Sequence, residues 1–157
     1  MEIKIVDLPA FKVVGPAYHG KNENNEIAQM WQQFMPRFGE IENKVKQQIA
    51  YGICDELDAD GAFTYVAGFA VTGEPETPDG MVAWDVPAQQ YAIFPTTLQT
   101  IHETYAYVFQ EWMPGSDYVR ATGPDFEYYD EEFDASVAEP KLYIYIPVIS
   151  EDVKVAV

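Results

Sequence analysis

Residues 123 to 133 read GPDFEYYDEEF, and one acidic residue, Glu127, lies inside the aromatic part of this stretch. The alternation of side chains along a strand puts Glu127 and Tyr129 on one face and Phe126 and Tyr128 on the other. A carboxylate buried there needs hydrogen-bond donors or a counter-charge, because otherwise its pKa rises until it is neutral. Glu127 is therefore the first candidate for chemistry in this chain.

Two interpretations of Glu127 are open at this stage. A carboxylate among aromatic rings suits a cationic ligand, because each ring face attracts a cation by about 0.5 to 2 kcal/mol and the carboxylate adds opposite charge. Tyrosine hydroxyl and tryptophan N–H groups would supply its hydrogen bonds. Alternatively, Glu127 is a rim carboxylate paired with Arg120 or Lys141, and the rings are ordinary core.

The elements that position Glu127 follow from a repeat. DLPAFKVVG begins at Asp7 and DVPAQQYAIF begins at Asp85, about half the chain later. Similarity at this distance predicts a duplicated unit with half-repeats at about 1–75 and 80–150, joined by the polar connector 73–80. We expect a single domain, 1–157, because 157 residues with 48% hydrophobic content suffice for one core.

Within each half-repeat, apolar residues at helical spacing are followed by two extended runs. The expected helix faces are Ile27, Met30, Trp31, Phe34 and Phe38, and Leu98, Ile101, Tyr105, Val108, Phe109 and Trp112. Asn24 or Asn25, and Thr96 or Thr97, are the expected N-caps. The extended runs are YGICDEL, FTYVAGFAV, DFEYYD and KLYIYIPVI. The fold class is thus α+β, a tandem β-α-β-β duplication with pseudo-two-fold symmetry, an antiparallel sheet with helices on one face, and a central ligand groove.

Aligning the two halves adds candidate binding residues. YGICDE over FEYYDE pairs Tyr51 with Phe126 and sets Gly52 opposite Glu127, so one half has no side chain where the other has a carboxylate. A glycine there leaves room for a ligand across a central groove. The candidate ligand-binding residues are Glu127, Tyr129, Tyr65, Phe69, Tyr51, Gly52, Trp31 and Trp112. The two tryptophans lie on the apolar faces of their helices, where such residues are more often core than ligand contacts.

Composition excludes several classes of function. A net charge of -17 repels phosphate backbones, so we expect no direct contact with nucleic acid. One cysteine, Cys54, and two histidines are too few for a typical metal site, and we expect no cofactor. The chain shows no targeting segment and no long apolar run, which predicts a cytoplasmic protein without membrane contact.

The whole chain, from about residue 2 to residue 149, resembles the GyrI-like family, the effector-binding domain of AraC-type and MerR-type multidrug regulators. The matching segments are EIKIVDLPAFKVVGPAYHG, YGI, FTYVAGFAV, VPAQQYAIF, YVFQEWMPGSDY, GPDFEYY and YIYIPV. The chain departs from the family at FPTTLQ, where many members carry a glycine, which affects a loop at the groove edge. It also starts directly at the first strand, without a helix-turn-helix segment.

The resemblance implies a tandem β-α-β-β fold with a ligand groove, in which the residue at Glu127 contacts lipophilic cations. It implies a binding protein for a small hydrophobic or cationic molecule, acting by sequestration or effector sensing. Two alternatives stay open. One is a hydrolase of cyclopropane-containing electrophiles with Glu127 as base and Tyr65 or Tyr129 as donor. The other is a regulator that contacts a protein partner such as gyrase.

Overall fold

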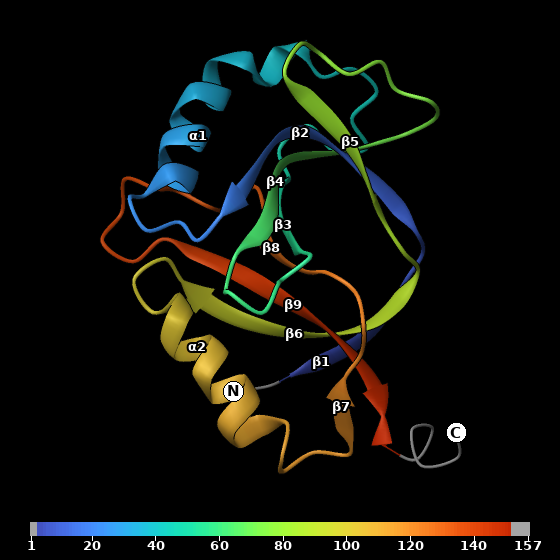
Figure 1. Cartoon of the computed structure of the whole chain (residues 1–157), viewed down its shortest axis with the longest axis vertical. Helices are drawn as coiled ribbons and strands as arrows, with labels where there is room; N and C mark the ends of the chain where they lie inside the picture. Colours follow the sequence, from blue (N-terminus) through green and yellow to red (C-terminus); the bar gives the residue numbers. More distant parts are fainter. Residues whose placement is uncertain (1–2, 152–157) are drawn as a thin grey trace.

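The computed structural model describes residues 3–151, which form a strongly curved antiparallel sheet and two helices (Figure 1). The elements in chain order are β1 (Lys4–Leu8), β2 (Phe11–Gly20), α1 (Glu26–Phe34), a 3-10 segment (Met35–Glu40), β3 (Ala50–Asp55), β4 (Phe63–Val71), β5 (Met81–Val86), β6 (Gln89–Thr97), α2 (Ile101–Tyr107), a π-helical segment (Val108–Trp112), β7 (Tyr118–Arg120), β8 (Asp125–Tyr129) and β9 (Lys141–Ser150).

The strand order is β1-β6-β9-β8-β3-β4-β2-β5, with β7 pairing to β9 outside this path. Read from either edge, the order passes through equivalent strands of the two halves and meets at the central pair, β3 and β8. The α+β class and the two-fold arrangement of β-α-β-β units expected from the sequence are confirmed. The four extended runs expected after the helices correspond to β3, β4, β8 and β9.

The Asp-x-Pro-Ala repeats mark places where the chain crosses from one half to the other. β1 pairs with β6 of the second half, and after Pro9 and Ala10 the chain continues into β2 of the first half. In the same way, β5 pairs with β2, and the chain continues past Pro87 into β6. Proline has no backbone N–H for a ladder, so it fits the bend between two strands. Each half thus lends its first strand to the other's edge.

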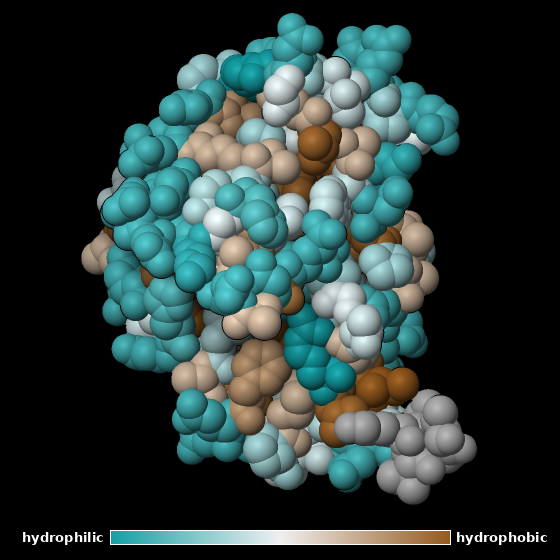
Figure 2. Space-filling view, viewed as in Figure 1, coloured by the Kyte–Doolittle hydropathy of each residue, from teal (hydrophilic) through white to brown (hydrophobic). Residues whose placement is uncertain are grey.

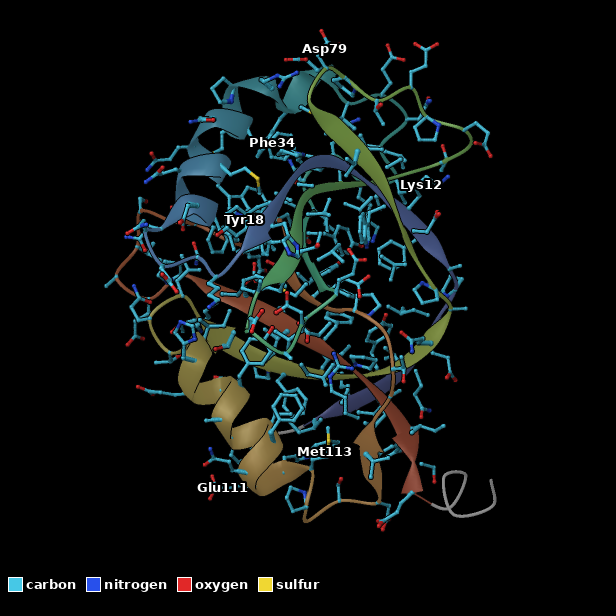
Figure 3. All side chains as sticks on the ribbon, viewed as in Figure 1. Lys12, Tyr18, Phe34, Asp79, Glu111 and Met113 are labelled. Atoms are coloured by element: carbon cyan, nitrogen blue, oxygen red, sulfur yellow. The ribbon has the colours of Figure 1, made fainter. Side chains whose placement is uncertain are left out.

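Both helices cover the same face of the sheet. Cross-strand partners share a face, and one row of partners runs Ala67, Gly52, Glu127, Ile144 across the four central strands. Ala67 belongs to the core under α1, with Phe34, and Ile144 belongs to the core under α2. Figure 3 shows Phe34 and Tyr18 on the side of α1 that faces the sheet. Glu127 therefore lies on the covered face, between the two helices.

The opposite face carries its own core. The next row of cross-strand partners consists of Val66, Ile53, Phe126 and Tyr145. These side chains pack with Val13, Val86 and Tyr91 in one hydrophobic core. Phe126 and Tyr145 stack with their ring centroids 4.6 Å apart. The sheet thus separates the Glu127 face from an aromatic core on the other side.

The helices differ in detail from the sequence prediction. Both are shorter than predicted, and each continues as a 3-10 or π-helical segment. This change of pitch rotates the later side chains, and Phe109 is 40% exposed instead of lying on the buried face. Leu98 precedes α2 in a turn and is 41% exposed. The N-cap of α2 is Thr100, since Thr96 and Thr97 still belong to β6, whereas Asn25 is the N-cap of α1 as expected.

The outer surface agrees with the acidic composition. Figure 2 shows hydrophilic residues over most of the face seen there, with hydrophobic residues exposed in separate small patches. Among the helices of residues 3–151, none combines the length and the apolar character needed to span a bilayer.

Candidate functional site between the two helices

Glu127 lies at the centre of a hydrogen-bonded group contributed by both halves of the chain. Its Oε1 accepts a hydrogen bond from the Tyr65 hydroxyl at 2.5 Å and from the Tyr129 hydroxyl at 2.8 Å. The indole Nε1 of Trp31 donates in turn to Tyr65 Oη at 2.9 Å. The Trp31 and Tyr129 rings meet edge to face, 5.6 Å apart. The carboxylate is thus oriented by α1, β4 and β8 together.

The two oxygens of Glu127 have different environments. Oε1 has two donors, whereas no hydrogen bond reaches Oε2 from residues 3–151, and no buried polar side-chain atom in that range lacks a partner. Oε2 therefore keeps some contact with solvent, in agreement with the intermediate exposure of the residue. Burial raises the pKa of Glu127, while the hydroxyls of Tyr65 and Tyr129 act to lower it and the charge of Asp125 raises it further.

Neither proposed ion pair of Glu127 forms within the described residues. Arg120 Nη2 instead lies 3.2 Å from Asp125 Oδ2, and Lys141 makes no salt bridge to Glu127. Arg120 also donates to the carbonyl oxygens of Ala121 and Gly123, which holds its guanidinium next to Asp125. The predicted pairing of Glu127 with Arg120 or Lys141 is therefore wrong.

Sequence reasoning missed the second acidic residue of this face, Asp125. Its Oδ1 accepts a hydrogen bond from the Tyr105 hydroxyl of α2 at 3.3 Å, and Arg120 holds its other oxygen. Burial raises the pKa of Asp125, against the lowering effect of the Arg120 charge. The signal was present in the sequence, because Asp125 and Glu127 are two positions apart in one strand and so share a face.

Gly52 lies directly across from Glu127 in the β3–β8 ladder. A Cβ added there would lie 2.1 Å from Tyr65 Oη and 2.5 Å from Glu127 Oε1. The glycine is therefore needed for the Tyr65–Glu127 hydrogen bond, because any side chain at this position would occupy the same space.

Two other candidate residues, Phe69 and Trp112, lie on the helix-covered face but pack in its core. Phe69 is 2% exposed and packs beneath α1 with Phe34 and Phe38. Trp112 packs against Phe94 and stacks on Tyr118 near α2. These contacts are core packing on the helix-covered face.

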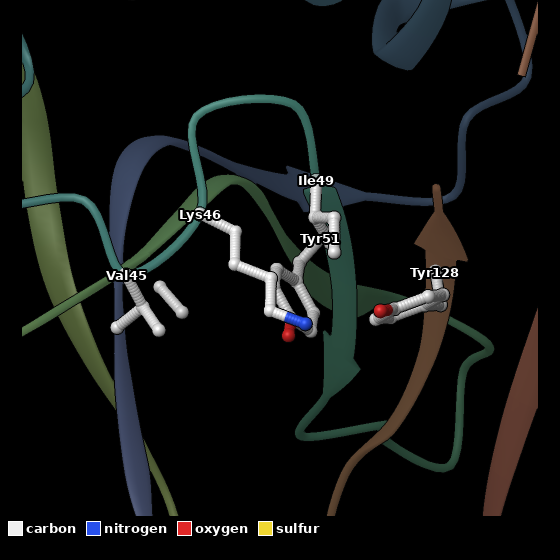
Figure 4. A pocket seen from close by; sticks show the side chains of 6 residues that line it. Val45, Lys46, Ile49, Tyr51 and Tyr128 are labelled. Atoms are coloured by element: carbon white, nitrogen blue, oxygen red, sulfur yellow. The ribbon is translucent and has the colours of Figure 1, made fainter. Parts of the chain in front are cut away.

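The structure does not bring Tyr51 to the Glu127 group. Tyr51 pairs with Tyr128 and lies on the opposite face of the sheet, because it is one residue from Gly52. There the two rings, 5.5 Å apart, line a small cavity of about 80 Å³ with Val45, Lys46, Ile49 and Ala70 (Figure 4).

Residues 4–148 match the family model described as integron-associated effector binding protein. The chain belongs to this family. The resemblance to GyrI-like effector-binding domains noted in the sequence is thereby confirmed, over nearly the whole described range.

The chain is also similar in sequence to a transcriptional regulator. The chain is 38% identical over 151 residues to the transcriptional regulator BrlR of Pseudomonas aeruginosa, an alignment that covers 94% of this chain and 56% of BrlR. The chain thus spans little more than half the length of this curated relative.

Solved structures share the fold at low sequence identity. SAV2435 bound to tetraphenylphosphonium superimposes with a TM-score of 0.70 and 16% identity, covering 95% of this chain and 94% of that one. The Cass2 integron cassette protein of Vibrio cholerae superimposes with a TM-score of 0.64 and 21% identity, covering 94% and 95%. The same fold is thus formed by widely divergent sequences.

Proposed function

We propose that this protein binds a lipophilic small-molecule cation between α1 and α2, with Glu127 as its charged contact. The observation that carries the proposal is the asymmetry of the Glu127 carboxylate. Oε1 is held by Tyr65 and Tyr129, whereas Oε2 keeps some contact with solvent and has no hydrogen-bond partner in the described residues. A ligand cation would supply the counter-charge that the carboxylate lacks.

The surroundings of Glu127 favour a lipophilic cation over a hydrated one. Tyr65 and Tyr129 hydrogen-bond to the carboxylate, and Trp31 hydrogen-bonds to Tyr65. The Phe133 ring packs on Tyr129 with centroids 4.8 Å apart. Aromatic faces attract cations and also bury apolar surface. The net charge of -17 adds a long-range attraction for cations that falls with ionic strength.

The comparisons supply the first probe and the biological context. SAV2435, which shares the fold, was solved with tetraphenylphosphonium, a compact aromatic cation. BrlR is a transcriptional regulator, and this chain corresponds to a little over half of it. We propose that the present chain acts by sequestering its ligand or by sensing it as an effector for a partner.

The test is calorimetric titration of the protein with tetraphenylphosphonium, with triphenylphosphine oxide as a neutral aromatic control. Glu127→Gln keeps the shape of the side chain and its Oε1 acceptor but removes the charge. We expect it to weaken cation binding at least about tenfold, which corresponds to about 1.4 kcal/mol, and to leave the neutral control unchanged. Glu132→Gln, an exposed residue after β8, changes the net charge equally and is the matched control.

Equal affinities of Glu127→Gln and Glu132→Gln for tetraphenylphosphonium would overturn the proposal. A second experiment separates ligand binding from the hydrolase alternative. Incubation with a cyclopropane-containing electrophile, followed by product analysis, should give binding without turnover. Product that disappears in Glu127→Gln would favour a hydrolase with Tyr65 as the donor, and the absence of any small-molecule ligand would favour a role through protein contact.

A further inference from the structure

The covered face of β8 carries two carboxylates but one nearby cation. Asp125 and Glu127 are two positions apart, which separates their Cα atoms by roughly 6.7 Å and points both side chains to the same side. Arg120 pairs with Asp125, and Glu127 has no salt bridge among residues 3–151. With both acids ionised, this part of the site has one uncompensated negative charge.

Arg120 is positioned to neutralise Asp125 and not Glu127. It reaches the site from β7, which pairs with β9, and its Nη2 donates both to Gly123 O at 3.1 Å and to Asp125 Oδ2 at 3.2 Å. The carbonyl of Ala121 accepts a further hydrogen bond from Nη1. Three acceptors, one of them Asp125 itself, therefore hold the guanidinium in place.

Asp125 itself is close enough to influence the ligand contact. Its charge raises the pKa of Glu127, so the two carboxylates repel each other across the site. The Asp125 side chain is 17% exposed and the Arg120 side chain is 32% exposed, so the pair is partly screened from water. A change in the charge of Asp125 or Arg120 should therefore change the electrostatic potential at Glu127.

Taking the proposed cation site as the starting point, we propose that Arg120 is a specificity-determining residue that restricts the site to ligands with one positive charge. Arg120 neutralises Asp125 and leaves Glu127 as the only charge contact. Without Arg120, Asp125 would become a second anionic contact two residues along the same strand. The site would then favour a ligand with two positive charges separated by a comparable distance.

The experiment compares ethidium and propidium, which share an aromatic cationic ring system but carry one and two positive charges. Fluorescence titrations at pH 8 with Arg120→Met should increase the preference for propidium over ethidium at least about tenfold relative to wild type. Arg120→Lys retains the charge and should leave the preference close to that of wild type. An unchanged preference in Arg120→Met would overturn the inference.

The double variant Arg120→Met/Asp125→Asn assigns any gain to Asp125. It should lose the propidium preference gained in Arg120→Met, because the second carboxylate is gone. A preference that survives in the double variant would show that Asp125 is not the second contact, and would also overturn the inference.

Asp125→Asn alone gives a readout even where Arg120→Met does not fold. This variant leaves the positive charge of Arg120 uncompensated in the site, so both dyes should bind more weakly, propidium more than ethidium. Equal affinities of wild type and Asp125→Asn for both dyes would again contradict the inference.

The outcome is separable from that of the proposed function. If Glu127→Gln fails to weaken ethidium binding, the cation site itself is wrong. If Glu127→Gln weakens binding but the Arg120 and Asp125 variants leave the dye preference unchanged, the site stands and the charge restriction by Arg120 is wrong.

Discussion

The sharpest structural prediction concerns Gly52→Ala. The added methyl group would lie 2.1 Å from Tyr65 Oη, 2.7 Å from Tyr65 Cζ and 2.5 Å from Glu127 Oε1. Tyr65 is 2% exposed and is held by Trp31, so it has little room to retreat. The methyl group must therefore separate Tyr65 from Glu127 or shift β3 away from β8.

The expected cost of Gly52→Ala is that of overpacking a filled interior, about 1 to 3 kcal/mol. Gly39→Ala is the matched control, because a Cβ at Gly39 meets nothing within 4 Å. Both changes lower the entropy of the unfolded chain in a similar way, so their difference isolates the steric cost. For a chain of this length the difference should be about 2 to 4 °C in Tm per kcal/mol.

Thermal unfolding followed by circular dichroism measures this difference, and titration with tetraphenylphosphonium tests its effect on the site. We expect Gly52→Ala to lower both Tm and cation affinity, and Gly39→Ala to lower neither. In a Tyr65→Phe background the cost of Gly52→Ala should shrink, because the closest atom is removed, but not vanish, because Cζ remains. Equal Tm values for Gly52→Ala and Gly39→Ala would refute the steric argument.

Three further predictions follow from the raised pKa of Glu127. Because a cation favours the ionised carboxyl, affinity for tetraphenylphosphonium should fall as pH decreases through this raised pKa, and calorimetry of Glu127→Gln over the same pH range should give a flat profile. A carboxyl whose pKa is higher in the folded than in the unfolded state destabilises the fold at high pH, and this cost disappears as pH falls through the folded pKa. Glu127→Gln should therefore raise Tm at pH 8 and lose that advantage in acid, measured against Glu132→Gln. Tyr129→Phe removes one donor to Oε1 and should move the midpoint of the affinity profile to higher pH; an unchanged midpoint would show that the hydroxyl does not stabilise the anion.

The central ladder shows how far the sequence can determine the site. Aligning the two halves set Gly52 opposite Glu127, and the structure pairs these residues in the β3–β8 ladder. The same alignment set Tyr51 opposite Phe126, whereas Tyr51 pairs with Tyr128. Residue numbers rise together in an alignment but run in opposite directions in an antiparallel ladder. The alignment of the two halves and the β3–β8 ladder therefore pair the same residues at one position only, Gly52 with Glu127. The pseudo-two-fold axis passes through this position.

Other features depend on tertiary packing and were missed for that reason. The π-helical segment after α2 changes which side chains face the core, and the spacing of Phe109 alone did not indicate it. Arg120 is close in sequence to both acidic residues, and its choice of Asp125 depends on the turn through Gly123, whose carbonyl holds the guanidinium. The role of Tyr105 depends on how α2 crosses β8, which no local pattern records.

The pairing of Gly52 with Glu127 also explains why the two halves differ at the centre. Near a two-fold axis, equivalent residues are also direct neighbours, so two large side chains of the same kind would compete for one space. The distance of 2.5 Å from a Cβ at Gly52 to Glu127 Oε1 shows that one partner must lack a side chain for the other to carry a carboxylate. Elsewhere the backbones of the two halves can match, but at this position only one of the two paired residues can carry a charged side chain. The Gly52–Glu127 pair, where the two halves differ, is therefore well placed to contact a single ligand from both halves.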